Sequence, residues 1–463
     1  MGPSIRALAH SSHPIMAQPQ LIAPEQTHGQ SRCARCDPCF NAPISCSLGV
    51  ALVLGGAALF LVNPFLAAAV AVAGLALAYC SVSQACRRRL RLGGWPVSEP
   101  GSLQEIQELL RAQDAPLAVG EAWSYHIGLK SVKDQKEKVI ALGNNWAGVV
   151  AMTETSVRVK SGMLWGELMR ELWEVNKAPM DRPAFDQMSL GASVRVAAHG
   201  FHVGGWFIDY VLAVQAVERG TGRVAEAKRG EADFWTLCFN EAWVITEVEL
   251  ETQQNRLVRV EGKSQSANAS TTQEEVDRYV QAEATEWREA PFVNMSIGGT
   301  AINRKWYTLD PVGVDDKDQN CLSYRLSLAW IGVSGIDSLG DAQTIMRTLW
   351  LVSTTVSRWL GTANFEFFVQ ERLNWDQVAL TFVKFHATYG GRTDFRERVR
   401  NGKAVTALDA VIYPKDIASW FEMVYNQLNL TQGILHPGKY DASSSAGKVR
   451  ILDFASFWTQ ISS

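Results

Sequence analysis

The chain has 463 residues, of which 47% are hydrophobic and 20% are charged, so it can form two or three globular domains with ample cores. Its net charge of −3 argues against binding of nucleic acid, which calls for a clearly basic surface. Of the eight cysteines only Cys238 and Cys321 lie beyond residue 90, so we expect the globular part to be reduced and without disulfides.

Residues 1–41 are rich in Pro, Gln, Ser and His and lack apolar periodicity, which predicts a disordered tail or a targeting segment. The early cysteines begin with a spacing seen in metal sites, but no second pair follows at the distance of a zinc ribbon. Acylation beside a membrane fits their position equally well. We therefore predict no metal site. The early cysteines are Cys33, Cys36, Cys39 and Cys46.

Residues 42–91 form a hydrophobic segment, in which Ala42 to Cys86 carry no charge. A single helix of that length would far exceed a bilayer core of roughly 30 Å. The pair Asn63-Pro64 breaks helices, so the pattern predicts two short helices in a membrane hairpin. Arginines on both flanks favour the cytoplasmic, stromal or matrix side for both ends. A cleaved targeting sequence and a buried hairpin of a soluble protein are the alternatives.

Between residues 92 and 255 short strands alternate with amphipathic helices. Ser102 is a candidate N-cap for the first helix. A short apolar strand ends at Gly120, and an alternating strand runs from Ser156 to Gly162. An amphipathic helix follows, and later a half-buried strand of sequence VITEVELET.

The stretch Ser189 to Val217 organises this region. It opens with small residues, reaches a turn at Ala197 to Gly200, and ends in an apolar run typical of a buried strand. So many small residues predict a main chain that a large flat ligand, or a charged one, approaches closely.

The order of elements indicates an α+β nucleotide-binding arrangement. The chain has no glycine-rich G-x-G-x-x-G turn, so a Rossmann dehydrogenase is disfavoured, and it lacks both a Walker lysine loop and a G-x-S-x-G serine elbow. The second half reads as a further domain with a sheet and helices. Within it, the polar run SQSANASTTQEE is expected to be a linker or a surface loop.

From about Pro96 to Thr252 the chain resembles the FAD-binding domain of the vanillyl-alcohol oxidase and p-cresol methylhydroxylase superfamily. Four motifs occur in the family's order: a turn after the first strand, a strand that ends in glycine, a small-residue turn that leads to His-Gly, and a closing Val-Ile-Thr. By this resemblance the cofactor-binding residues are Gly120, Glu121, Ala122, Trp123, Ser124, Tyr125, Gly162, Ser189, Gly191, Ala192, Ser193, Ala198, His199, Gly200, Val244, Ile245 and Thr246.

The resemblance implies an α+β fold with a two-subdomain FAD-binding domain of the p-cresol methylhydroxylase type in residues 92–255. An α+β substrate (cap) domain follows in residues 256–430, and residues 431–463 return to the flavin site. The main-chain N–H groups of the small-residue turns are expected to bind the pyrophosphate. Many family members attach FAD through a histidine of the first motif, where this chain has Trp123. FAD is therefore expected to be bound non-covalently, although His199 is another candidate for attachment.

Two later segments resemble the sugar-alcohol and aldonolactone oxidases of the same superfamily. Glu366 lies in a Glu-aromatic strand, and His436 to Lys439 resemble a His-Trp-Gly-Lys signature. The resemblance implies that Lys439 stabilises the negative charge of reduced flavin. It also implies that His436 or Glu366 binds the substrate hydroxyl or accepts its proton.

Three functions follow from these observations. The first is a membrane-anchored FAD oxidoreductase that oxidises a small-molecule alcohol, polyol or sugar lactone. The second is a flavin-dependent reductase of a lipid or sterol alkene. The third is a non-catalytic subunit of a membrane complex, which is favoured by Trp123, by Glu121 in the phosphate turn and by Trp243 near the closing motif. Sequons at Asn268, Asn294 and Asn429 would suit a lumenal domain, but we follow the flanking arginines.

Overall fold

The computed structural model describes residues 97–112, 117–119, 139–183, 186–200, 206–281, 292–311, 360–400 and 403–462. The predicted tail and membrane hairpin lie outside these residues, as do the early cysteines and the first flavin motif from Gly120 to Tyr125. In the described ranges no helix has both the length and the apolar character needed to cross a membrane.

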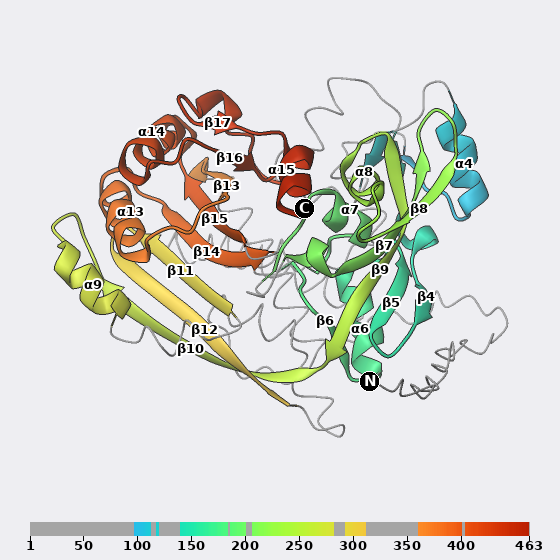
Figure 1. The fold of residues 1–463 in the computed structure, drawn as a ribbon, viewed down its shortest axis with the longest axis horizontal. Helices are drawn as coiled ribbons and strands as arrows, with labels where there is room; N and C mark the ends of the chain where they lie inside the picture. The colour runs from blue at the N-terminus through green and yellow to red at the C-terminus, as the bar shows by residue number, and fades with distance from the viewer. Residues whose placement is uncertain are drawn as a thin grey trace, which may run out of the picture.

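The described chain forms two units side by side (Figure 1). The first unit contains a small parallel sheet and a larger antiparallel sheet. The small sheet has the order β1 (Val97–Ser98), β3 (Val139–Ala141), β2 (Leu117–Val119). The larger has the order β4 (Val149–Met152), β5 (Ser156–Lys160), β9 (Trp243–Gln254), β7 (Val211–Glu218), β8 (Val224–Lys228), with β6 (Lys177–Pro179) also paired to β9.

Helices of the first unit pack against these sheets. They are α4 (Leu103–Arg111), α6 (Trp165–Glu174), α7 (Leu190–Arg195) and α8 (Phe234–Phe239). The predicted cap of α4 is confirmed, because the hydroxyl of Ser102 accepts from the N–H of Glu105. The amphipathic face predicted for α6 is buried at Leu168 and Leu172, but Val175, which was expected on the same face, lies at the C-cap and is 48% exposed. The strands predicted at 156–160, 211–217 and 244–252 are confirmed as β5, β7 and β9.

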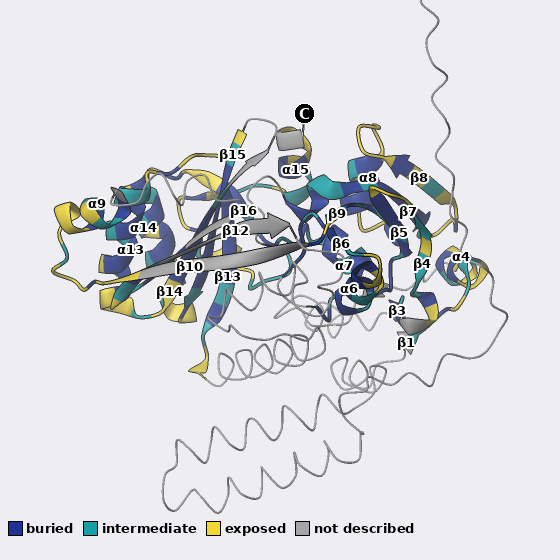
Figure 2. Cartoon of the chain, turned by 90° about the horizontal axis from the view of Figure 1, so that it is seen from below, coloured by how far each residue is buried: buried dark blue, intermediate teal, exposed yellow. Residues whose placement is uncertain are grey.

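The second unit is built on a sheet that begins directly after Asn255. Its strand order is β10 (Arg256–Ser266), β12 (Ala301–Pro311), β11 (Phe292–Gly298), β14 (Arg392–Arg400), β15 (Lys403–Ile412), β13 (Ala363–Val369), β16 (Gln432–Leu435), β17 (Arg450–Ile451). All neighbours are antiparallel except β16 and β17. Helices α9 (Gln273–Gln281), α13 (Trp375–Tyr389) and α14 (Ile417–Leu428) lie on one side of this sheet (Figures 1 and 2).

The loop expected at SQSANASTTQEE is only partly correct. Its first residues, up to Ser266, complete β10, and α9 begins at Gln273. The loop itself is the short turn between them. Here Asn268 Oδ1 accepts from Ser270, and the carboxylate of Glu275 accepts from the N–H of Thr272. This last contact caps the helix, so polar composition concealed a strand end and a helix start.

Alternation along β13 places its side chains on two faces of the sheet. Phe365 and Phe367 pack against Trp420 and Phe421 on the helical side. The intervening residues, Glu366 and Phe368, must therefore face the first unit. The last helix, α15 (Phe454–Ser462), returns to pack against α8 of the first unit, which leaves the C-terminus at the junction of the two units (Figure 1).

Candidate functional site

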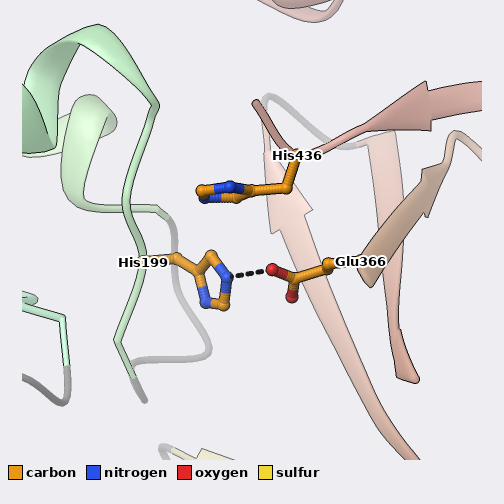
Figure 3. A group of neighbouring side chains, drawn as sticks. All are labelled: His199, Glu366 and His436. Atoms are coloured by element: carbon orange, nitrogen blue, oxygen red, sulfur yellow. Dashed lines mark hydrogen bonds and ion pairs between the residues drawn. The ribbon is translucent and has the colours of Figure 1, made fainter. Parts of the chain in front are cut away.

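The candidate site lies where the two units meet. His199 comes from the segment that follows α7 of the first unit, whereas Glu366 on β13 and His436, next after β16, belong to the second (Figure 3). The Nε2 atom of His199 lies 2.8 Å from Oε2 of Glu366. The main-chain N–H of His436 donates to the carbonyl of Glu366 at 2.9 Å, which fixes the turn that carries Lys439.

Five side chains of this site form a closed ring of polar contacts, which we call the polar ring. Nδ1 of His199 is 3.2 Å from Nη1 of Arg396, and Nη2 of Arg396 is 3.1 Å from Oδ2 of Asp409. Nζ of Lys439 is 2.8 Å from that same Oδ2 and 3.1 Å from Oε2 of Glu366. The contact between Glu366 and His199 closes the ring.

The strand register explains why these residues meet. Glu366 on β13 stands opposite Asp409 on β15, and Arg396 on β14 stands opposite Ala407, two residues from Asp409. Side chains two residues apart share a face, so all three point toward the first unit. The side chain of Glu366 is fully buried, and those of Arg396 and Asp409 are less than a tenth exposed.

Hydrogen bonding defines the tautomers of both histidines. A guanidinium can only donate, so Nδ1 of His199 accepts from Arg396, and the proton of His199 lies on Nε2, where it is donated to Glu366. In His436, Nδ1 accepts from the N–H of Gly438 at 2.9 Å, so its proton also lies on Nε2. Within the described part of the chain no residue accepts a hydrogen bond from Nε2 of His436, which leaves this N–H available to a ligand.

The charge state of the site follows from its neighbours. Burial raises the pKa of Glu366, but the hydrogen bond from His199 and the positive charge of Lys439 hold this pKa well below its usual range. With His199 in its neutral tautomer, Lys439 supplies the cation. Burial lowers the pKa of Lys439, but Asp409 and Glu366 outweigh it and raise that pKa above its ordinary value. Burial lowers the pKa of His436 to about 3, so this imidazole is neutral at pH 7.

Two buried carboxylate oxygens of the polar ring make no hydrogen bond with the residues that the structure describes. They are Oε1 of Glu366 and Oδ1 of Asp409. A buried acceptor without a donor is costly, of the order of 1–3 kcal/mol or more when charged. Oε1 of Glu366 is therefore an acceptor that a ligand could satisfy.

A metal ion fits this site poorly, although His199, Glu366 and His436 bring ligand atoms within 4.8 Å of one another. A histidine that binds a metal through one nitrogen usually donates a hydrogen bond from the other. Here both Nδ1 atoms accept instead, and Nζ of Lys439 stands 3.1 Å from the only carboxylate of the set. The arrangement is that of a hydrogen-bonding site.

The small-residue turn of the first unit differs from the expected open row of N–H groups. The N–H groups of Leu190, Gly191, Ser193, Ala198 and Gly200 all donate to acceptors of the protein at 2.8–3.0 Å, those of Ser193 and Ala198 within the same stretch. A Cβ at Gly200 would lie 1.7 Å from the carbonyl oxygen of Arg182. These small residues are thus required by close packing of the protein on itself, and these N–H groups are not free to bind phosphate.

The other predicted cofactor residues are also used within the first unit. A Cβ at Gly162 would lie 2.3 Å from the carbonyl oxygen of Leu142. The carbonyl of Ile245 accepts from the hydroxyl of Ser161, and the hydroxyl of Thr246 donates to the carbonyl of Gln215. The roles of Gly162, Ile245 and Thr246 in binding a cofactor remain predictions. Three residues of this set remain: Ser189 is the N-cap of α7, Ala192 lies within α7, and Val244 lies in β9.

Trp243 is buried in the first unit. The guanidinium of Arg223 lies 4.8 Å from the centre of its ring. Arg195 donates to the carbonyls of Trp243 and Asn240, and burial lowers the pKa of Arg195 to about 10, so it is still charged at pH 7. The indole is thereby fixed in the protein's own packing.

Comparison with known proteins supports the fold. No protein-family model matches the chain, and no curated protein does. Among solved structures, a chitooligosaccharide oxidase superposes with a TM-score of 0.55 at 12% identity, over 82% of this chain and 92% of that protein. The chain shares the fold of that oxidase. A solvent-stable cholesterol oxidase (TM-score 0.49, 14% identity, 72% and 81% coverage) and a cholesterol oxidase from B. sterolicum (0.47, 14%, 71% and 79%) superpose less well.

The sequence pointed to four of the side chains that meet here: His199, Glu366, His436 and Lys439. It missed Arg396 and Asp409. Asp409 was detectable, because it interrupts the otherwise apolar run VTALDAVI of β15, and a charge in such a strand is seldom buried without a partner. Arg396 lies in the strongly charged strand RTDFRERVR, where no pattern sets it apart.

Proposed function

We propose that the chain is an FAD-dependent oxidoreductase that oxidises the CH–OH group of a small-molecule alcohol, polyol or sugar lactone. The observation that carries the proposal is the buried set of Glu366, His436 and Lys439, with an unpaired acceptor and an available N–H, at the junction of two units. The shared fold with a chitooligosaccharide oxidase supports it.

The residues of the site fit the polar edge of a flavin. Lys439 keeps its positive charge and remains about a fifth exposed, so it can approach the N1–C2 edge of the ring. The described N–H groups of the small-residue turn do not offer a pyrophosphate site, so binding of the phosphates would depend on Gly120 to Tyr125. When bound, FAD would supply the acceptor for the hydride of the substrate.

The side chains of the second unit are suited to bind a hydroxyl group. Oε1 of Glu366 would accept the hydrogen of the hydroxyl, and Nε2 of His436 would donate to its oxygen. Because His436 is neutral and its Nδ1 is already engaged by Gly438, it serves as a donor and not as the base.

Glu366 is the better proton acceptor, although its pKa is held low by Lys439 and His199. An alcohol becomes far more acidic as hydride leaves its carbon, because the positive charge that develops is shared with the oxygen. A carboxylate of low pKa can therefore take the proton late in the step. The N–H of His436 would remain bonded to the oxygen as it becomes a carbonyl.

A non-catalytic role is the second candidate, since the described small-residue turn is filled by the protein itself. For both candidates we propose that residues 42–91 anchor the chain in a membrane, with the folded part on the cytoplasmic, stromal or matrix side and a membrane-complex partner in the second case.

The spectrum of the purified full-length protein tests the proposal. We expect visible flavin absorbance and, without oxygen, its bleaching by polyols, sugars or lactones. Glu366→Gln should keep the flavin and lower the rate of bleaching by roughly 100-fold or more, the size of a lost proton acceptor. Colourless protein that ignores added FAD would refute the proposal. Bleaching only by reduced nicotinamide would favour the alkene reductase.

A further inference from the structure

We propose that Arg396, held by Asp409, is a positioning residue: it fixes the tautomer of His199, so that His199 donates to Oε2 of Glu366 and leaves Oε1 for the substrate. The proposal rests on the proposed function for what the substrate is. The tautomer itself can be tested on the protein with or without a flavin.

Arg396 sets the direction of the hydrogen bonds that His199 makes in the polar ring. Arg396 carries donors only, and its Nη1 points at Nδ1 of His199. The other neutral tautomer would place a proton on Nδ1 against the guanidinium and the lone pair of Nε2 against the carboxylate, 2.8 Å away. Both contacts would then be repulsive, so Arg396 selects the tautomer with Nε2–H.

Asp409 holds the guanidinium in place. Its Oδ2 accepts from Nη2 of Arg396 at 3.1 Å and from Nζ of Lys439 at 2.8 Å. The side chain of Arg396 is only 7% exposed, which restricts its rotation. The guanidinium therefore meets His199 in one orientation.

The tautomer affects the carboxylate that would receive the substrate's proton. As a neutral donor, His199 occupies one oxygen of Glu366 without neutralising its charge. If Nδ1 were released from Arg396, His199 could take up a second proton beside Glu366 and form an imidazolium–carboxylate pair. Glu366 would then be a weaker acceptor at Oε1. Among the residues that the structure describes, Glu366 and Arg396 contact His199, Lys439 contacts Glu366, and neutral His436 lies at a ring distance of 5.7 Å from His199.

Histidine ¹⁵N NMR of the full-length protein, with the His199 signal assigned by its loss in His199→Gln, tests the proposal directly. In the wild type at pH 7 we expect Nε2 to be protonated and Nδ1 not. In Arg396→Met we expect His199 to carry a proton on Nδ1. Arg396→Lys should restore the wild-type pattern, because an ammonium group also donates to Nδ1.

The matched control is Arg158→Met. Arg158 also contacts two carboxylates, those of Glu226 and Glu247, but on the sheet of the first unit away from the site. It should leave the signal of His199 unchanged. If Arg396→Met also leaves the Nε2–H pattern intact, Arg396 has only a structural role and the proposal is wrong.

The catalytic consequence has a separate readout. If the protein reduces its flavin, Arg396→Met should lower the rate of reduction by roughly 10-fold or more and make it depend on pH where the wild type does not, while Arg396→Lys recovers it. A protein that holds no flavin but shows the expected ¹⁵N pattern would refute the proposed function and keep the positioning role. Normal catalysis with a changed tautomer would refute that role.

Discussion

Removal of the charge of Lys439 provides the most direct test of the polar ring. Its Nζ contacts Oδ2 of Asp409 at 2.8 Å and Oε2 of Glu366 at 3.1 Å, in a site where Glu366 is fully buried. Loss of one partner of a buried ion pair costs about 3–5 kcal/mol, because the remaining charge is left uncompensated. Lys439→Met, which keeps the unbranched side chain except for its terminal ammonium group, should therefore lower the free energy of unfolding by about that amount at pH 7.

The loss should depend on pH in a defined direction. In the wild type the depressed pKa of Glu366 stabilises the fold above the unfolded value of about 4.3, and this contribution is lost as pH falls. In Lys439→Met the ammonium is lost and only the hydrogen bond from neutral His199 opposes the effect of burial, so the pKa of Glu366 should rise above the unfolded value. As pH falls, protonation of Glu366 removes its uncompensated charge in the variant. The difference in the free energy of unfolding between the wild type and Lys439→Met should therefore shrink from pH 7 to pH 5.

Urea unfolding followed by tryptophan fluorescence at pH 7, 6 and 5 measures this difference. Lys415→Met is the control, since Lys415 is exposed and lies beside Tyr413 at the surface. It should change stability by less than about 0.5 kcal/mol at every pH. A loss for Lys439→Met that is below about 1 kcal/mol, or that stays constant over this range, would contradict the role given to the buried charges.

Three further predictions concern the backbone and a second buried histidine. Gly200→Ala should destabilise the protein by at least about 2 kcal/mol in urea, because its Cβ would overlap the carbonyl of Arg182. Gly101→Ala should be nearly neutral, because its Cβ would make only an ordinary contact with Asn145 at 3.9 Å; equal effects of the two substitutions would contradict the packing described. Ala197→Gly should raise stability by up to about 1 kcal/mol, since Ala197 has a φ of 44°, and a large loss in the melting temperature would refute strain there. Burial lowers the pKa of His386 to about 4, so protonation of this group should lower the free energy of unfolding by roughly 3 kcal/mol between pH 6.5 and 4. In His386→Gln the free energy of unfolding should depend less on pH over this range, and an unchanged slope would exclude His386 as the source.

Local patterns predicted much of the fold. The period of apolar residues located α6, β5 and β9, and the cap at Ser102 located α4, because these features depend on neighbours a few residues away. The polar run SQSANASTTQEE led to the prediction of a loop where a strand ends and a helix begins, since the polar side chains typical of loops also cap helices.

The site could be predicted only in part. Glu366 and the turn from His436 to Lys439 were indicated by a family resemblance, and His199 by its motif. Arg396 and Asp409 reach the site because β14 pairs with β15. The contact of Arg396 with His199 joins residues that are 197 positions apart in the sequence. No local pattern encodes such a contact. The close packing around the small-residue turn was equally hard to predict, because small residues are required both where a ligand approaches and where the protein packs on itself.

The hydrophobic core of the first unit is completed by residues from the far end of the chain. Trp206 packs against Phe368 at 5.1 Å and against Trp458 at 5.5 Å between ring centroids. Val405 and Ile434 belong to the same buried cluster. During synthesis the first unit would therefore leave the ribosome with Trp206 uncovered, and it could reach its final packing only after the last helix has emerged. Folding of the two units is thus coupled in time, and loss of α15 should leave both unable to mature.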